Sequence, residues 1–196
     1  MRIIAGDLKG RKLFTPNDSK IRPTTDKVKE SLFNMIAEYL EGAIVIDLFS
    51  GTGNLGLEAI SRGASRCYFG DKSRESIALT NQNIAYCKVQ YKSITIIGDF
   101  EKVLNRIPEK VDIILLDPPY KQGPIDRCLV SISELSLLSA GGIIVAEHYA
   151  NELLPDKVCG FYKIKEKRYG TIGITIYRLE LEDTVYDKKS SLRRFI

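Results

Sequence analysis

From residue 43 onward, short apolar runs alternate with stretches of helical periodicity, and this alternation limits the folds open to the chain. The apolar runs have the length of strands and lie at 43–48, 66–69, 94–97, 111–116 and 142–146. Helical stretches follow the first four runs, near 55–62, 74–86, 100–106 and 125–138. Strands that alternate with helices form a parallel sheet with helices on both faces. The sequence therefore predicts an α/β fold.

Ahead of this alternation, the sequence predicts a hairpin and then a helix. Strand-like pieces at 2–5 and 11–14 flank a connection bounded by glycines, which is typical of a β-hairpin. From Asp26 onward the apolar residues fall on one helical face, and Gly42 is expected to end that helix.

Another hairpin is predicted near the end of the chain. The segments 162–168 and 171–179 flank a Tyr-Gly pair and indicate an antiparallel hairpin at the edge of the sheet. The chain has 196 residues, which suits one full domain with small appendages. We therefore expect an N-terminal basic arm (1–24), one domain (25–181) and a polar, basic C-terminal tail (182–196).

The formal net charge is +4, and the excess of cations lies at one end of the chain. Residues 1–30 hold eight of the 29 Lys and Arg residues but four of the 25 Asp and Glu residues, so that 21 of each remain elsewhere. Such asymmetry indicates a segment that contacts a polyanion, and a solubilising arm is the alternative interpretation.

Cysteine spacing and hydropathy indicate which sites and compartments to expect. The four cysteines form no CxxC pair, so the sequence predicts neither a metal site nor a redox motif. Apolar runs stay well below the roughly 18 residues that a membrane span requires. The apolar stretch at 3–5 is too short for the core of a signal peptide. We expect a monomeric, cytoplasmic protein that binds no metal and no membrane.

A glycine-rich turn follows the first expected strand. Residues 47–56 read DLFSGTGNLG and contain the pattern G-x-G-x-x-G between a strand and a helix. Glycines allow a sharp turn and the close approach of a ligand, and the next helix offers free N–H groups. The pattern fits a dinucleotide and also S-adenosylmethionine. Asp47 favours the latter, because its carboxylate would repel a pyrophosphate and attract the ammonium of an amino-acid cofactor.

Carboxylates also end the next two expected strands. Asp71 can accept hydrogen bonds from two ribose hydroxyls, which serves either cofactor. Asp99 can accept from an adenine amino group with Phe100 beside the ring, and it can also cap the helix that follows. Parallel sheets bind ligands at the carboxyl ends of their strands, so both positions are candidates for cofactor contact.

The fourth expected strand leads into the loop Asp117-Pro118-Pro119-Tyr120. Two prolines restrict the backbone and remove two N–H donors. The Asp117 carboxylate and the Pro118 carbonyl are then the acceptors beside a flat ring. That set suits a planar group with an exocyclic amine, which would donate to both acceptors while Tyr120 stacks on its ring.

This loop predicts methyl transfer to the amine. The lone pair of an aromatic amine is delocalised, so the amine is a poor nucleophile. Acceptors placed for a tetrahedral nitrogen favour attack on a sulfonium methyl group and stabilise the positive charge that develops. The single histidine, His148, follows the fifth expected strand, but we do not count it as catalytic because the reaction needs little base catalysis.

Several motifs together resemble one known family. The loop at 117–120 resembles motif IV of amino-directed N-methyltransferases, and the turn at 47–56 resembles their motif I. Over roughly residues 1–180 the chain is similar to the bacterial RsmD family, whose members methylate N2 of a guanine in small-subunit ribosomal RNA. The segments that carry this similarity are RIIAG (2–6), GRKL (10–13), RPTTD (22–26), LFN (32–34), GLEA (56–59) and SRGA (61–64).

The resemblance implies a Rossmann-like class I methyltransferase fold, with a mixed seven-stranded sheet and an N-terminal β-hairpin and helix. It implies S-adenosylmethionine as cofactor, S-adenosylhomocysteine as product, and ribosomal RNA or an assembly intermediate of the small subunit as partner. The implied cofactor-binding residues are Asp47, Phe49, Gly51, Gly53, Asp71, Asp99 and Phe100. The implied catalytic residues are Asp117, Pro118, Pro119 and Tyr120. The candidates for RNA contact are Arg2, Lys9, Arg11, Lys12, Arg22 and Thr24.

One departure from the family and three alternatives stay open at this point. The family usually has Glu at the end of the second strand, where this chain has the shorter Asp71. An adenine-N6 methyltransferase acting on DNA or RNA fits the same loop, because adenine also presents an exocyclic amine. A nicotinamide-dependent oxidoreductase fits the glycine turn alone, although Asp47 opposes it. The last alternative is an RNA-binding module without activity.

Overall fold

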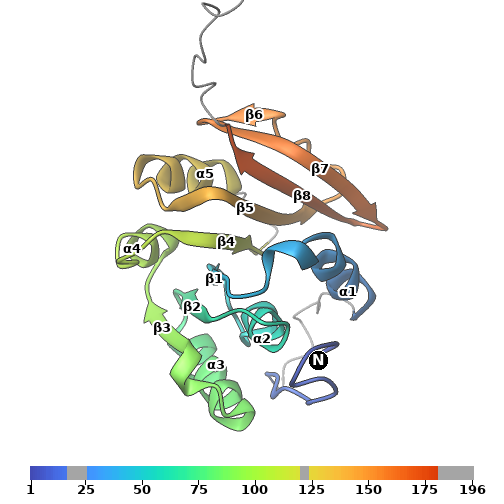
Figure 1. Cartoon of the computed structure of the whole chain (residues 1–196), viewed down its shortest axis with the longest axis vertical. Coiled ribbons are helices and arrows are strands. Elements are labelled where there is room, and N and C mark those ends of the chain that lie inside the picture. The colour runs from blue at the N-terminus through green and yellow to red at the C-terminus, as the bar shows by residue number, and fades with distance from the viewer. Residues whose placement is uncertain (17–25, 120–123, 181–196) are drawn as a thin grey trace, which may run out of the picture.

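One eight-stranded sheet forms the centre of the computed structural model, which describes residues 1–16, 26–119 and 124–180 (Figure 1). The strands follow the spatial order β3-β2-β1-β4-β5-β8-β7-β6. They comprise β1 (Ile44–Asp47), β2 (Arg66–Asp71), β3 (Ser93–Ile97), β4 (Val111–Leu116), β5 (Leu138–Tyr149), β6 (Lys157–Val158), β7 (Phe161–Tyr169) and β8 (Ile172–Leu179). The α-helices are α1 (Asp26–Met35), α2 (Asn54–Ser61), α3 (Arg74–Cys87), α4 (Phe100–Leu104) and α5 (Ile125–Glu134).

The pairing of the strands confirms the predicted mixed α/β sheet. Strands β1 to β5 run parallel to their neighbours, while β8 is antiparallel to β5, and β7 and β6 continue antiparallel beyond it. The eighth strand, one more than expected, is the two-residue β6, which pairs with β7. In the register, Asp47 of β1 lies between Phe69 of β2 and Leu115 of β4. The carboxyl ends of these three strands therefore meet at one edge of the sheet.

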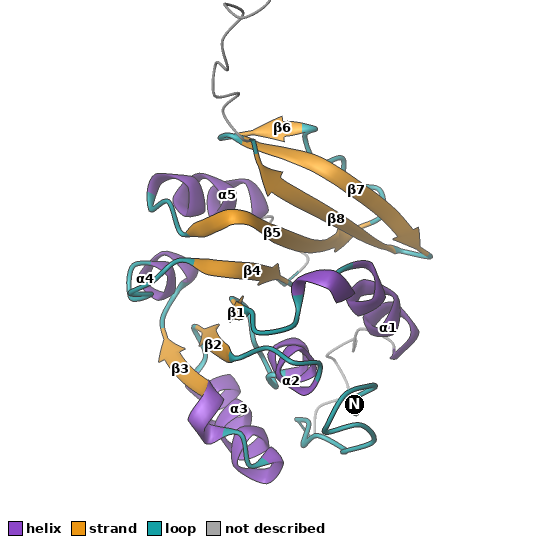
Figure 2. Cartoon of the chain, viewed as in Figure 1, coloured by secondary structure: helices purple, strands orange, loops and turns teal. Residues whose placement is uncertain are grey.

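Helices cover both faces of the sheet, as Figure 2 shows in purple against the orange strands. Buried residues of α1, α2 and α3 form one hydrophobic cluster with Ile113 and Leu115 of β4. Residues of α4 and α5 form a second cluster with Ile114 and Leu116 of the same strand. Consecutive strand residues point to opposite faces, so an apolar run such as β4 supplies both layers of the core.

In the predicted N-terminal hairpin, the antiparallel reversal of the chain is confirmed, but the two predicted strands are wrong. Arg2 and Lys12 form an isolated antiparallel bridge, and Ile3 N donates to the Arg11 carbonyl at 2.9 Å. Neither piece extends into a strand, because the amides of Ile4 and Ala5 donate to a buried carboxylate on α2. The backbone groups that a ladder would need are thus used elsewhere.

Three other boundaries also differ from the expectation. The first helix ends at Met35 and is followed by a 3₁₀ turn over Ala37–Tyr39, so Gly42 lies beyond it. Helix α5 stops at Glu134 rather than near 138, and β5 begins at Leu138, before the expected 142. Leu137 and Leu138 explain both shifts, since they pack into the second cluster at the start of the strand. Among the described residues, every helix is too short or too polar to cross a bilayer.

Candidate functional site

A cavity of about 1030 Å³ opens at the carboxyl edge of the parallel strands. Its wall draws on the ends of β1, β2, β3 and β4, and on Met1 and Pro16 of the N-terminal segment. The predicted site residues that line it are Asp47, Phe49, Gly51, Asp71, Asp99, Phe100, Asp117, Pro118 and Pro119. Residues from three sequence motifs therefore share one cavity. Gly53 is absent from this wall; it has φ 77° and serves as the N-cap of α2.

The turn between β1 and α2 is held by hydrogen bonds from its own glycines. Gly56 N donates to Asp47 Oδ2 at 2.8 Å, and Gly51 N donates to Asp71 Oδ2 at 3.0 Å. Asp47 is 1% exposed. Burial raises the pKa of Asp47 to about 7, with a smaller rise from the Asp71 charge and an opposing effect of the Gly56 hydrogen bond. A positive charge close to Asp47 would therefore stabilise the ionised form of its carboxyl group.

The surroundings of Gly51 and Gly56 explain why glycine suits these two positions of the G-x-G-x-x-G pattern. A Cβ at Gly56 would lie 2.3 Å from Phe69 Cε1 and 2.6 Å from Cys67 Sγ, so α2 packs directly on β2. A Cβ at Gly51 would meet no atom within 4 Å, and Gly51 itself lines the cavity. The backbone at Gly51 is thus open to the close approach of a ligand.

The carboxylates at the carboxyl ends of β2 and β3, Asp71 and Asp99, both contact backbone amides. Asp71 Oδ1 accepts from Ser73 N at 2.8 Å, in addition to the bond from Gly51 to its other oxygen. Asp99 caps α4, because its Oδ1 accepts from Lys102 N at 2.8 Å. The capping role that the sequence left open for Asp99 is therefore confirmed. Both residues still face the cavity, so these bonds also fix where the carboxylates point.

Asp117 follows β4 and lies half-buried on the cavity wall beside Pro118 and Pro119. Its pKa is raised well above the ordinary range by burial, and then by the charges of Glu147 and Asp47. Glu147 on β5 is itself only 2% exposed. The charges of Glu147 and Asp47 thus act on Asp117 at the cavity wall, and they favour a cationic or hydrogen-donating ligand beside it. Tyr120 lies outside the described residues.

His148 is part of the sheet and not of the cavity wall. Its ring nitrogens lie 2.8 Å from the Tyr149 carbonyl and 2.9 Å from Thr175 Oγ1, and the residue is 3% exposed. Gly173 on β8 leaves room for the ring, since a Cβ there would lie 2.5 Å from its Cε1. Both ring nitrogens therefore already have partners in the core.

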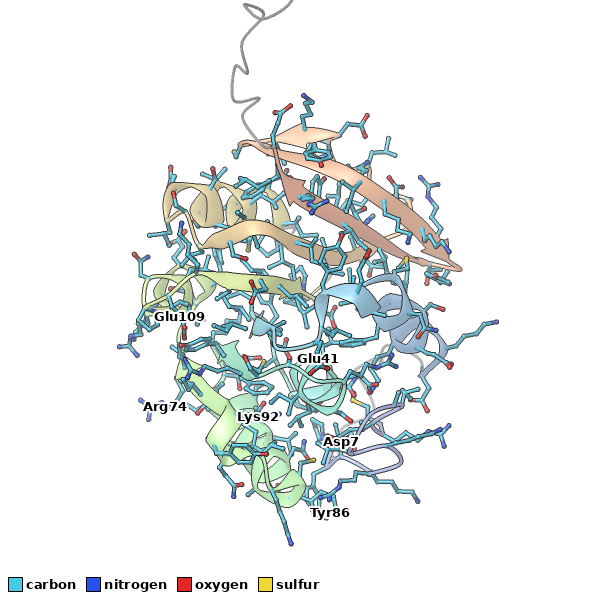
Figure 3. All side chains as sticks on the ribbon, in the orientation of Figure 1. Asp7, Glu41, Arg74, Tyr86, Lys92 and Glu109 are labelled. Carbon is cyan, nitrogen blue, oxygen red and sulfur yellow. The ribbon has the colours of Figure 1, made fainter. Side chains whose placement is uncertain are left out.

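The candidates for RNA contact divide into three groups. Arg2, Lys9 and Lys12 are exposed on the N-terminal segment. Arg11 is partly buried and donates to the Tyr86 carbonyl at 3.1 Å; Figure 3 labels Tyr86 near the end of α3, beside this segment. Arg22 and Thr24 lie outside the described residues, as does the 182–196 tail.

Sequence reasoning missed further residues of the cavity wall. Ser50, Arg127 and Tyr149 line it as well. Arg127 lies with its guanidinium carbon 5.2 Å from the centroid of the Phe100 ring, and it pairs with Glu101 at 2.6 Å. Ser50 adjoins the glycines and could have been found from the motif. Arg127 lies in a helix and carried no signal in the sequence.

Comparison with known proteins decides the family. The family described as Conserved hypothetical protein 95 matches residues 1–178. Ribosomal RNA small subunit methyltransferase D from Haemophilus influenzae is 32% identical over 185 residues, which cover 91% of this chain and 92% of the relative. The protein of the same name from Escherichia coli (strain K12) is 29% identical over 182 residues, with 93% and 91% covered. The chain belongs to the RsmD family.

Solved structures agree with membership of the RsmD family. The structure of yhhF from Escherichia coli, a proposed methyltransferase, has a TM-score of 0.82 and 28% identity, and covers 92% of this chain and 98% of its own. A conserved hypothetical protein of Streptococcus pyogenes has a TM-score of 0.72 and 33% identity over 76% of this chain and 94% of its own. The RsmD-family chain is therefore a methyltransferase with the predicted Rossmann-like fold.

Proposed function

We propose that this chain transfers a methyl group from S-adenosylmethionine to the exocyclic N2 of a guanine in small-subunit ribosomal RNA. One observation carries the proposal: Asp117 and Pro118, the two acceptors suited to an amine, line the same cavity as the glycine turn. The relatives named Ribosomal RNA small subunit methyltransferase D support ribosomal RNA as the substrate. The guanine N2 target rests on the resemblance of the motifs to the RsmD family.

The cavity suits S-adenosylmethionine in its chemistry. Asp47 would accept from the ammonium of the methionine end, and Gly51 leaves the backbone open beside it. The hydroxyl of Ser50 is buried without a hydrogen-bond partner among the described residues, so it offers one more polar contact there. Asp71 would bind the ribose, and Asp99 with Phe100 would bind the adenine. When bound, the cofactor supplies an electrophilic methyl group on a positively charged sulfur.

The residues after β4 would orient the amine of the target base. The Asp117 carboxylate and the Pro118 carbonyl would accept hydrogen bonds from its two N–H groups and turn the nitrogen lone pair toward the cavity. Burial and neighbouring negative charges raise the pKa of Asp117, so a ligand that donates hydrogen bonds or carries positive charge favours the ionised form of this carboxyl group. The carboxylate would also stabilise the positive charge that grows on nitrogen during transfer.

The RNA must present an unstacked base to reach this site. Removing a base from its stack costs a few kcal/mol, and a single-stranded loop lowers that cost. The exposed cations of residues 1–16 would bind phosphates near the cavity mouth, because the same segment contributes Met1 and Pro16 to the wall. The partner is therefore ribosomal RNA, free or within an assembling small subunit.

The test is to identify the product. Small-subunit ribosomal RNA from cells that lack this protein is incubated with the purified chain and S-adenosylmethionine, digested to nucleosides and analysed by mass spectrometry. We expect N2-methylguanosine with the wild-type chain and none with D117A. Formation of N6-methyladenosine instead would support the adenine-directed alternative, and absence of any methylated nucleoside would refute the proposal.

A further inference from the structure

Two buried side chains join the N-terminal segment (residues 1–16) to the glycine turn. Met1 and Pro16 already line the cavity, and Thr52 Oγ1 lies 3.5 Å from Met1 Sδ. The segment and the turn are also linked through two buried residues of the helices, Asn83 on α3 and Lys29 on α1. Each of these residues contacts both structures at once.

Asn83 is fully buried and uses both ends of its amide. Its Oδ1 accepts from Phe14 N at 2.8 Å, and its Nδ2 donates to the Phe14 carbonyl at 3.1 Å. The same Nδ2 donates to the Thr52 carbonyl in the glycine turn at 2.9 Å. One rigid amide group therefore fixes the distance between Phe14 and Thr52.

Lys29 makes the second bridge and is 1% exposed. Its Nζ donates to the Arg2 carbonyl at 2.7 Å, to Asn54 Oδ1 at 2.7 Å, and to Glu58 Oε2 at 3.1 Å. These three acceptors use all three protons of the ammonium. Asn54 is the first residue of α2 and lines the cavity. The bridge therefore runs from the backbone of a basic residue in the segment to the cavity wall.

Neither the segment nor the turn can move alone without breaking these bonds. A shift of the segment would leave the Asn83 amide and the Lys29 ammonium with unpaired buried donors, which is costly in a low-dielectric interior. A shift of the turn would leave the same donors without their acceptors on Thr52 and Asn54. The preferred positions of the two structures are thus coupled.

We propose that Asn83 and Lys29 are positioning residues that couple RNA binding on the N-terminal segment to cofactor binding at the glycine turn. This inference rests on the proposed function, which supplies the two ligands. Lys9 and Lys12 expose their charges on the same segment, and Arg2 is also exposed but pairs with Asp26 at 2.8 Å. Phosphates that bind these cations hold the segment in place. A held segment keeps the turn in its binding geometry. Coupling of this kind is reciprocal, so each ligand tightens the binding of the other by the same factor.

The experiment measures that factor directly. Calorimetry gives the Kd of S-adenosylhomocysteine, which cannot be consumed, with and without saturating protein-free small-subunit ribosomal RNA. The Kd of the RNA is measured with and without S-adenosylhomocysteine. We expect each ligand to tighten the other by at least about fivefold in the wild-type chain, and by less than about twofold in N83A.

S61A is the matched control. Ser61 Oγ accepts from Leu8 N at 2.9 Å and donates to the Ala5 carbonyl at 2.5 Å, so it also anchors the segment, but it makes no bond to the glycine turn. We expect S61A to keep most of the coupling factor. Equal loss in S61A and N83A would show that general loosening is responsible and would overturn the assignment.

A second variant protects the test against misfolding of N83A. N54A removes the bond from Lys29 to the glycine turn and leaves the buried Lys29–Glu58 ion pair in place, and its circular dichroism spectrum shows whether it is folded; we expect the same loss of coupling. A wild-type factor near one, or an unchanged factor in both bridge variants, would overturn the inference. Coupling without any methylated product would instead refute the proposed function alone, because binding of both ligands is measured without turnover.

Discussion

The amide of Gly56 donates a 2.8 Å hydrogen bond to Oδ2 of Asp47, across the turn that joins β1 to α2. This bond holds one oxygen of a buried carboxylate against the helix at the cavity wall. The bond also opposes the rise that burial causes in the pKa of Asp47. The carboxylate can thus ionise near neutral pH when a cation approaches.

Asp47 makes the cofactor-free protein less stable as the pH rises. Its pKa is about 7 when folded and 3.8 in a model peptide, so the unfolded chain loses the proton first. The resulting penalty is absent below about pH 4, grows through the window between the two values, and reaches on the order of 4 kcal/mol above it. In D47N, we expect the free energy of unfolding to exceed the wild-type value at about pH 8 and to approach it at about pH 4. Urea denaturation measures both, and an equal difference at the two pH values would contradict the prediction.

Loss of the Asp117 carboxylate should remove methyl transfer while leaving cofactor binding nearly unchanged. Transition-state stabilisation by such a group is typically worth about 10²-fold or more in rate. We expect D117A to lose at least that much, and D117N, which keeps one acceptor oxygen, to lose less. Transfer of labelled methyl groups to RNA gives the rate, and calorimetry with S-adenosylhomocysteine gives the affinity. Full turnover by D117A would refute the role of the loop.

Removal of the Glu58 carboxylate should destabilise the fold strongly. Glu58 is fully buried and accepts from Ile4 N, Ala5 N, Lys29 Nζ and Arg62 Nε. Loss of one partner from a buried ion pair typically costs roughly 3–5 kcal/mol, so we expect E58A to lose about that much in chemical denaturation. The control E101A breaks the exposed pair with Arg127 and should cost under about 1 kcal/mol. Similar losses in the two variants would be inconsistent with this account.

RNA binding should weaken steeply with salt through the N-terminal cations. Each Lys or Arg contact to a phosphate contributes about 0.7 to 0.9 to the slope of log affinity against log salt, the lower value for single strands. The K9A/K12A double variant should therefore bind with a slope shallower by about 2, as filter binding across a salt series would measure. K157A is the control, since Lys157 lies on β6 and pairs with Glu180 at 2.6 Å. A wild-type affinity that does not change with salt would exclude this role of the segment.

The sheet could be predicted because each of its parallel strands has a short apolar run in its own sequence. Positions 113–116 are apolar without a break, and the structure buries Ile113 and Ile114 in different layers. The turn at 47–56 could also be predicted, because its glycines and Asp47 lie between an expected strand and an expected helix. These signals depend on neighbours in the sequence and do not require knowledge of the rest of the fold.

The partners of the polar core were not predictable in the same way. Lys29 and Glu58 lie in helical stretches, where a charged residue usually faces solvent. Their burial depends on backbone groups of Arg2, Ile4 and Ala5, which are 25 or more residues away. The same bonds explain why the N-terminal pieces form one bridge instead of two strands.

Gly56 sets how closely α2 packs on β2 beside the cavity. Any side chain there would strike Phe69 and Cys67, so even one methyl group would push α2 outward from β2. The first turn of that helix carries Asn54 and Leu55 on the cavity wall, and it would move with the axis. The hydrogen atom that Gly56 carries in place of a side chain therefore sets the separation between α2 and β2, and with it the position of this part of the cavity wall.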